Sequence, residues 1–438
     1  MKKRILMFIT GLCVAVLTLA VQSETVNAQT LVKILEPTEE ISAQLLDGEE
    51  VRKILGNVRL EIDGRVVVCD SAVQYLNKPL VRAFSVQIAD EKESIKARDL
   101  FFNTETEIAT FIGNVEIRSD DFTASADTID MNLETSDAHL RGKVQWFDST
   151  RYAEANEAFV NRNEKRYRLY GRVYSESADE SEWFTADSLE TDSTGQAWLK
   201  GQAFLMKLDK PETGNSSKVD TTMLRAGYIY LSDQDGTEEI FAVKQPVVWS
   251  TRLSSRSDTL SYRSDTGIYM LTGSPKAWRD RLQLTADWIE AIILDEEMKE
   301  LNAGTRPMIV LEDSATGRLH QLSGDSLHIT LDEGEISRLS LSQNSEILFH
   351  QFTEDEKADG AVKLTTKGPA KVRFENGEVS ELGGENSIDG YYLPENPQIE
   401  ALRIEGFDWQ PEQKPLKFSQ PEKRFSEVYS IFKRSNLK

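Results

Sequence analysis

An all-β fold, built as a solenoid-like stack of antiparallel rungs, is predicted by a repeat, an alternation of residue types and a set of turn signals. The repeat pairs a glycine with an Ala-Asp or Cys-Asp step about half a period later. Asp70, Asp99 and Asp127 are 29 and 28 residues apart, and Asp258 and Asp287 are again 29 apart. A fixed period of this size indicates one supersecondary unit stacked many times. The sequence therefore predicts rungs of about 28 residues and a function distributed along a long surface.

The glycine of the repeat begins a short motif whose later positions vary along the chain. The copies that recur at regular intervals are Gly56-Asn57-Val58, Gly113-Asn114-Val115, Gly142-Lys143-Val144, Gly171-Arg172-Val173 and Gly201-Gln202-Ala203. We expect the glycines to be turn positions that need a permissive backbone. We expect the aspartates to cap backbone N–H groups at strand corners.

Apolar and polar residues alternate within each strand-like run, as in strands that bury one face. The residues expected to point inward share this spacing: Val58, Leu60, Ile62, Val115, Ile117, Phe122, Ile129, Met131 and Leu133. The phase changes by one near Asp127, because Phe122 and Ala124 are even and Ile129 and Met131 are odd. Such an odd step indicates a corner or a bulge. A roll of these rungs that is incompletely closed would contain a continuous apolar groove.

The two ends of the sequence differ from the repeated middle. Residues 1–28 have a basic start, an apolar core and small residues before Gln29, which together predict a cleaved secretory signal peptide. Residues 29–390 carry the repeat, and residues 391–438 form a Pro-rich tail. The tail ends in Phe425, Val428, Tyr429 and Phe432, whose spacing predicts one face of a short helix. We expect this tail to cover the C-terminal edge of the stack and to leave the N-terminal edge free.

Composition argues against several classes of function. The formal net charge of −22 disfavours binding to nucleic acid and to anionic membranes. The four histidines are scattered, and we find no phosphate-binding loop, catalytic triad motif or metal-ligand spacing. Cys69 follows a β-branched run and is expected to be a small core residue. The sequence thus predicts no catalytic residues, no metal site and no cofactor.

The repeat motifs resemble those of a known family. Gly56-Asn57-Val58 followed by Cys69-Asp70-Ser71-Ala72, and Gly113-Asn114-Val115 followed by Ala126-Asp127-Thr128-Ile129, are similar to the repeats of OstA-like proteins. This family includes the LptA-type periplasmic proteins of lipopolysaccharide transport. The resemblance implies an elongated twisted β-jellyroll in the periplasm whose apolar interior carries lipid A acyl chains. It also implies end-to-end pairing of edge strands, with other transport proteins or with further copies of the chain.

The sequence agrees with two different functions. In the first, the protein is a lipid carrier or bridge, and the inward-facing residues named above line a groove for lipopolysaccharide or another lipid A-type glycolipid. In the second, the same stack has a closed, packed interior and serves as a non-catalytic scaffold or interaction protein. The two differ in whether the interior is filled, which depends on how strands pair.

Overall fold

The computed structural model describes residues 32–425 except 36–37, 90–92, 121, 136, 162, 210–219, 252, 295–296, 333, 354, 356 and 376–377. The predicted signal peptide and most of the predicted C-terminal helix lie outside the described residues. Strands make up 70% of the structure and helices 2%, so the all-β prediction is confirmed. The chain divides into two compact units. Unit 1 comprises Met1–Ala203 and Pro421–Lys438, and unit 2 comprises Phe204–Gln420.

Unit 1 is an antiparallel meander of long strands. Its strands are β1 (Lys33–Leu35), β2 (Glu40–Leu46), β3 (Glu49–Ile62), β4 (Arg65–Tyr75), β5 (Leu80–Ala89), β6 (Glu93–Asn103), β7 (Ile108–Ser119), β8 (Phe122–Asn132), β9 (Asp137–Asp148), β10 (Arg151–Asn161), β11 (Arg166–Ser177), β12 (Glu182–Thr191) and β13 (Ala197–Asp209), the last of which extends past the unit boundary. Successive strands from β3 to β12 pair through short hairpin turns, so two strands make one rung of the predicted length.

A bulge divides the long strands of unit 1 into two halves. In β3 the register shifts between Leu55 and Val58, where Gly56 and Asn57 have φ of 75° and 45°. The half before this bulge pairs with β2, and the half after it pairs with β1. We name the halves in register with residues 49–55 layer A and those in register with residues 58–62 layer B. Because apolar side chains of both layers are buried, the layers pack with their inner faces together.

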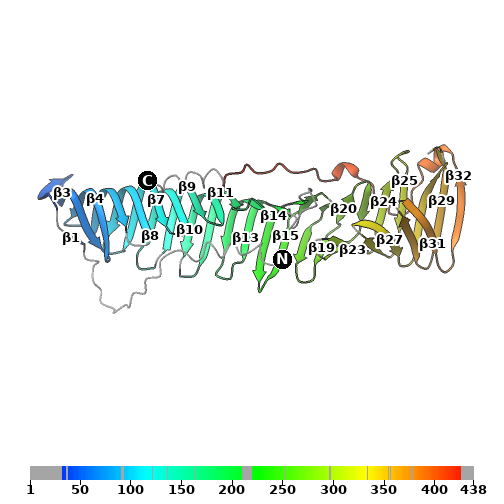
Figure 1. Cartoon of the computed structure of the whole chain (residues 1–438), viewed down its shortest axis with the longest axis horizontal. Coiled ribbons are helices and arrows are strands. Elements are labelled where there is room, and N and C mark those ends of the chain that lie inside the picture. The colour runs from blue at the N-terminus through cyan, green and yellow to red at the C-terminus, as the bar shows by residue number, and fades with distance from the viewer. Residues whose placement is uncertain are drawn as a thin grey trace. The chain divides into compact units, whose positions relative to one another are not determined.

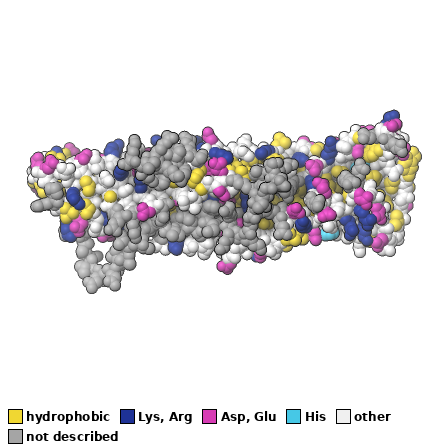
Figure 2. All heavy atoms as spheres, viewed as in Figure 1, with side chains coloured by type: hydrophobic (Ala, Val, Ile, Leu, Met, Phe, Trp, Pro, Cys, Tyr) yellow, Lys and Arg dark blue, Asp and Glu magenta, His cyan; other side chains and the backbone are white. Residues whose placement is uncertain are grey.

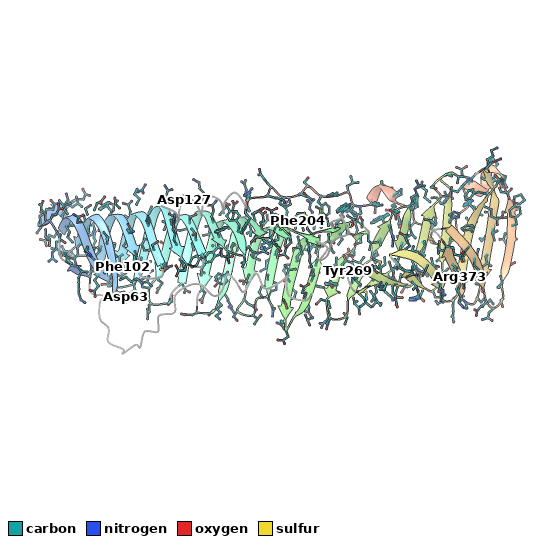
Figure 3. All side chains as sticks on the ribbon, viewed as in Figure 1. Asp63, Phe102, Asp127, Phe204, Tyr269 and Arg373 are labelled. Atoms are coloured by element: carbon teal, nitrogen blue, oxygen red, sulfur yellow. The ribbon has the colours of Figure 1, made fainter. Side chains whose placement is uncertain are left out.

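The repeated aspartates lie at these bulges. A Cβ atom built on Gly142, whose φ is 77°, would lie 2.5 Å from Oδ2 of Asp127 on the preceding strand. Glycine is therefore required both by its positive φ and by the close approach of Asp127. This packing over glycine takes the place of the backbone cap expected for the aspartates. Figure 3 shows Asp127 at the bulge margin of unit 1 and Asp63 at the opposite margin, where hairpins turn.

Unit 2 has shorter strands, because the chain breaks at each corner where unit 1 has a bulge. Its strands are β14 (Asp220–Gln234), β15 (Thr237–Val243), β16 (Val247–Ser250), β17 (Ser254–Arg256), β18 (Thr259–Arg263), β19 (Ile268–Thr272), β20 (Lys276–Arg279), β21 (Leu282–Thr285), β22 (Trp288–Leu294), β23 (Glu297–Gly304), β24 (Met308–Glu312), β25 (Leu319–Ser323), β26 (Ser326–Asp332), β27 (Glu335–Leu341), β28 (Ser345–Phe352), β29 (Ala358–Thr366), β30 (Ala370–Glu375), β31 (Glu378–Gly384) and β32 (Asp389–Pro394). Two short helices follow, α2 (Pro397–Glu400) and the 3₁₀ helix η1 (Pro411–Gln413).

Hydrogen bonding separates the unit 2 strands into two layers. Layer C runs in the order β14-β15-β18-β19-β22-β23-β26-β27-β30-β31. Layer D runs in the order β14-β16-β17-β20-β21-β24-β25-β28-β29-β32. The Tyr269 hydroxyl of layer C lies near Ser255 of layer D, which identifies the inner face of layer D. Ser255 is in register with Ala277, and beyond it with Leu284 and Ile309, so these residues share the inner face.

Candidate functional site

The residues predicted to line a groove lie in the interior of unit 1. Eight of the nine are buried, with exposed fractions of 5% or less, and Leu133 follows the end of β8 and is half-buried. The buried residues on the inner face of layer B are Val58, Leu60, Ile62, Val115, Ile117 and Phe122, and those of layer A are Ile129 and Met131. Their inward direction agrees with the sequence pattern. Contact of these residues with a lipid stays a prediction.

Two further candidate sites, which the sequence did not indicate, lie on the outer face of layer B in unit 1 and on the outer face of layer D in unit 2. The segment that follows β32 forms a strap, which we define as residues 395–425 (red in Figure 1). Adjacent residues on a strand point to opposite faces of its sheet. Gln283 and Gln321 alternate with the inner residues Leu284 and Leu322, so they point outward from layer D, toward the strap.

Two glutamines hold the strap in unit 2 by the same arrangement of hydrogen bonds. The Gln283 side chain donates to the Asp408 carbonyl oxygen at 2.9 Å and accepts from the Gln410 N–H at 2.8 Å. The Gln321 side chain donates to the Leu402 carbonyl oxygen at 3.0 Å and accepts from the Ile404 N–H at 2.9 Å. Each amide thus bridges a carbonyl and the N–H two residues later, as a neighbouring strand would. Both glutamines are 0% exposed, so these bonds satisfy polar groups that have no access to water.

Apolar packing fixes the same part of the strap. Ile399 and Ile404 join a buried cluster with Met308, Val310 and Leu348 of layer D. Leu402, Phe407 and Trp409 of the strap pack against the edge of this cluster. Where the strap passes over it, layer D is therefore buried on both faces, by layer C on one side and by the strap on the other.

In unit 1 the last described residues of the strap are held by polar and charged groups. Glu176 of β11, which is 0% exposed, accepts from the N–H groups of Arg424 at 2.6 Å and Phe425 at 2.9 Å. The Tyr174 hydroxyl lies 2.7 Å from both the Glu422 carbonyl oxygen and a Glu176 carboxylate oxygen. Burial, followed by the hydrogen bond to Glu176, raises the pKa of Tyr174, so the hydroxyl stays a donor.

Ion pairs and ring contacts also hold the end of the strap on unit 1. Lys423 pairs with Glu180 at 2.5 Å, and the Arg424 guanidinium pairs with Glu154 of β10. The ring of Phe425 packs on Phe147 of β9, with centroids 5.2 Å apart. The end of the strap is thus held mainly by hydrogen bonds and charge, whereas its beginning combines apolar burial with the hydrogen bonds of Gln283 and Gln321.

The described part of the tail does not cover the C-terminal edge as the sequence analysis predicted. Residues 389–394 are themselves the edge strand β32, and Tyr391 and Tyr392 on it are exposed. The residues after β32 turn back along layer D instead, because its outward residues are apolar or carry amides that can bind a backbone. The signals missed in the sequence were large aromatic residues at outward positions, such as Tyr174, Trp183 and Trp278.

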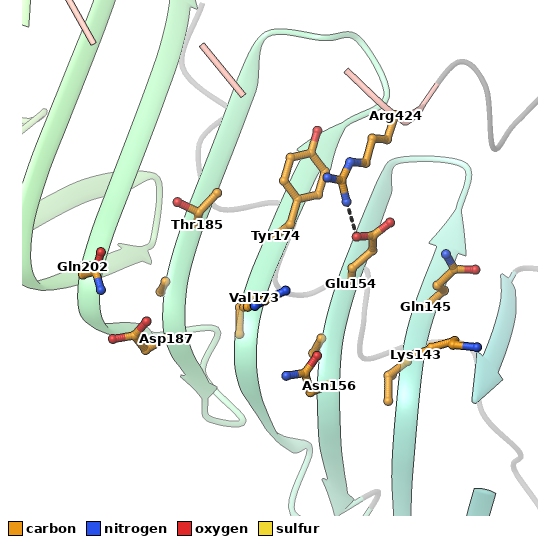
Figure 4. Close-up of a pocket in the computed structure, with 14 residues that line it drawn as sticks. Lys143, Gln145, Glu154, Asn156, Val173, Tyr174, Thr185, Asp187, Gln202 and Arg424 are labelled. Carbon is orange, nitrogen blue, oxygen red and sulfur yellow. Dashed lines mark hydrogen bonds and ion pairs between the residues drawn. The ribbon is translucent and has the colours of Figure 1, made fainter. Parts of the chain in front are cut away.

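A cavity of about 630 Å³ lies on the outer face of layer B beside the strap (Figure 4). Lys143, Arg172 and Gln202 border it from β9, β11 and β13. Arg424 of the strap also lines it, with its guanidinium beside Tyr174 and paired with Glu154. Asn156 and Asp187 stand between these side chains on β10 and β12, and all five residues from the strands are exposed. The cavity therefore offers cations, amides and one free carboxylate within a single unit.

Comparison with known proteins bears on the N-terminal part of the chain. Residues 29–179 match the family model described as OstA-like protein. This segment is therefore similar to OstA-like proteins. No curated protein matches the chain.

The matched segment ends in the turn after β11. It therefore contains all of the predicted lining residues, and also Tyr174 and Glu176, which bind the end of the strap. It contains neither Gln283 and Gln321 nor the strap. The match thus confirms the family resemblance and leaves the covered layer of unit 2 as a feature outside the matched region.

The described residues also bear on metal binding, membrane insertion and thiol chemistry. Within them, no group of three or more His, Cys, Asp or Glu side chains could hold a metal ion. No helix in the described part of the chain is long and apolar enough to cross a membrane. Cys69 is buried as expected, and burial raises its pKa to about 11, which keeps the thiol protonated and unreactive. Figure 2 shows acidic and basic side chains interspersed over the face in view.

Proposed function

We propose that the protein is a non-enzymatic lipid carrier of the periplasm. In this proposal it shields the acyl chains of lipopolysaccharide, or of another lipid A-type glycolipid, between the inner faces of its layers during transport to the outer membrane. The supporting observation is that apolar rows on both inner faces recur in register from rung to rung of an OstA-like segment.

A carrier of this kind needs no catalytic group. An acyl chain gains about 0.8 kcal/mol for each CH₂ group that leaves water. A periodic apolar lining gives similar affinity at each rung, so a lipid would meet no deep trap along the stack. Entry of the lipid would require the inner faces to separate, because Val58, Leu60, Val115 and Ile129 are 0% exposed.

That burial favours a second candidate function. A stack whose interior is filled by its own side chains would act as a scaffold in the same transport system without binding lipid. The rungs would then provide stiffness, and interaction would take place at the edge strands.

Site-specific photocrosslinking in intact cells separates the two functions. A photoreactive residue at Ile117 on the inner face, or at the half-buried Leu133, should form an adduct with a glycolipid if the protein is a carrier. The same residue at Arg59, an exposed outward position of layer B, is the control. Adducts at Arg59 alone would overturn the carrier model. Absence of glycolipid adducts at both inner positions, in protein that resists proteolysis like the wild type, would establish the scaffold.

Partner binding is proposed at the N-terminal edge. Strand β2 pairs with β3 on one side, and its residues Ile41 and Leu45 are 53% and 71% exposed. An exposed apolar edge strand is a template for strand addition by another protein. We expect Leu45→Lys to weaken co-purification with transport partners, or self-association, at least tenfold without loss of folded protein. Unchanged association would exclude this edge as the contact.

A further inference from the structure

The cavity beside Arg424 lies where the sequence repeat changes. The second residue of the glycine motif is Asn57 in β3 and Asn114 in β7, with φ of 45° and 50°. The three copies that border the cavity replace asparagine with Lys143, Arg172 and Gln202, which keep φ of 49°, 53° and 43°. The change thus affects the side chain while the backbone stays the same.

This replacement is unfavourable for the fold alone. Asparagine tolerates the left-handed region better than lysine, arginine or glutamine does. Three long polar side chains in that conformation therefore retain a local cost that asparagine would lower. Such strain tends to persist at functional positions. The long side chains also reach farther from the bulge than asparagine could, and all three residues line one cavity.

The cations of the cavity are available to a ligand. Among the described residues, no carboxylate lies within ion-pair distance of Lys143 or Arg172, although the chain as a whole carries a net charge of −22. Arg424 is engaged with Glu154 and lines the same cavity. Asn156, Thr185 and Gln202 add hydrogen-bonding groups around these cations.

We propose that this cavity binds a saccharide that carries a phosphate or carboxylate group. The lysine and the two arginines suit the anionic group, since guanidinium and ammonium groups form strong charge-assisted hydrogen bonds with phosphate and carboxylate. The amides, the Thr185 hydroxyl and the Asp187 carboxylate suit the donors and acceptors of sugar hydroxyls. A volume of about 630 Å³ falls within the range of small-molecule sites. The site lies on the outer face of layer B, so it does not depend on a lipid entering the interior.

Isothermal titration calorimetry of the full mature chain tests the proposal with glucose 1-phosphate, glucose and inorganic phosphate as separate probes. We expect glucose 1-phosphate to bind at least tenfold more tightly than either of the other two. The double variant Lys143→Asn/Arg172→Asn restores the residue used by the earlier repeats, so it should fold normally and lose at least tenfold in affinity. Arg424→Gln keeps the backbone bonds to Glu176 and should also weaken binding. Lys96→Asn, at an exposed outward position of β6, should bind like the wild type.

Three results would overturn the site. The first is no measurable binding of glucose 1-phosphate. The second is that inorganic phosphate or glucose binds as tightly as glucose 1-phosphate. The cavity would then not recognise the sugar and its anionic group together. The third is unchanged affinity in the folded double variant. If micelles of a phosphorylated glycolipid displace bound glucose 1-phosphate, the natural ligand of the site is a lipid headgroup. If they do not displace it, the natural ligand is a free saccharide. Neither outcome depends on crosslinking at Ile117.

Discussion

The outer face of layer B differs between its first strands and its later ones. Over β3 to β8 most outward residues are polar or charged, for example Arg59, Lys96 and Glu116, and none is aromatic. Over β9 to β12 they include Tyr152 and Trp183, each 1% exposed, beneath or beside the strap. The inner faces of both regions have the same alternation. The difference shows that the stack needs only its inner faces to fold, and that buried aromatic outward residues occur where a further layer covers them.

The largest effect is expected where the strap enters an apolar cluster. Ile404→Asp would place a charge among Val310 and Leu348, and should lower the free energy of unfolding of unit 2 by about 4 kcal/mol. Urea denaturation followed by tryptophan fluorescence measures this change. Leu416→Asp, at a strap position that is 83% exposed, should have almost no effect. Equal effects at the two positions would show that the strap is not a packed layer.

A pH effect is expected from the layer that is covered on both faces. Burial, followed by the nearby His350, lowers the pKa of His320 from 6.5 to about 4. The unfolded state therefore binds more protons between these values, and folding stability falls as pH drops from about 6.5 to about 4. The loss amounts to about 3 kcal/mol at 1.36 kcal/mol per pKa unit.

The variant His320→Asn tests this dependence, because asparagine does not titrate and its side-chain oxygen can accept the His350 N–H in place of Nδ1. Its unfolding free energy should fall by about 3 kcal/mol less than that of the wild type over the same pH range. His328→Asn, at an exposed position, should follow the wild type. A parallel pH profile for the His320 variant would contradict the assignment.

A smaller effect is expected from Gln283 and Gln321, the two glutamines that hydrogen-bond to the strap. Gln283→Leu removes two bonds to the strap and the acceptor of the Trp278 indole N–H, so it should cost about 2 kcal/mol. Hydrogen exchange should show faster exchange at the Gln410 N–H in this variant. Gln87→Leu makes the same change on the uncovered outer face of β5 and should leave stability within about 0.5 kcal/mol. Similar losses for both variants would remove the distinction between covered and uncovered faces.

The smallest effect is expected on the bare part of layer B. Val68 points outward from β4 and is 44% exposed. Val68→Lys should change the unfolding free energy by no more than about 0.5 kcal/mol, as measured by thermal and urea unfolding. A loss well above this value would indicate that a further layer covers β4 as well.

The sequence by itself determined the fold class and the repeating unit of this protein. The period between Asp70, Asp99 and Asp127 gave the rung length, because each rung repeats one bulge at which glycine is required. Alternation predicted the inward direction of residues such as Val58 and Ile117, because every second residue of a strand points to the same face of the sheet. The phase change near Asp127 corresponds to the register shift between Ser125 and Thr128.

Only the tertiary structure decided what covers the outer face. Gln283 lies between two leucines and reads as a solvent-facing residue, yet it is fully buried under residues more than one hundred positions later in the chain. Local periodicity carries no information about such a long-range contact. The same holds for the cavity, since Lys143 and Arg172 line it together with Arg424 only because the end of the strap lies on layer B. Sequence patterns record which face of a strand is buried by its own rung, whereas burial by a distant segment depends on the path of the whole chain.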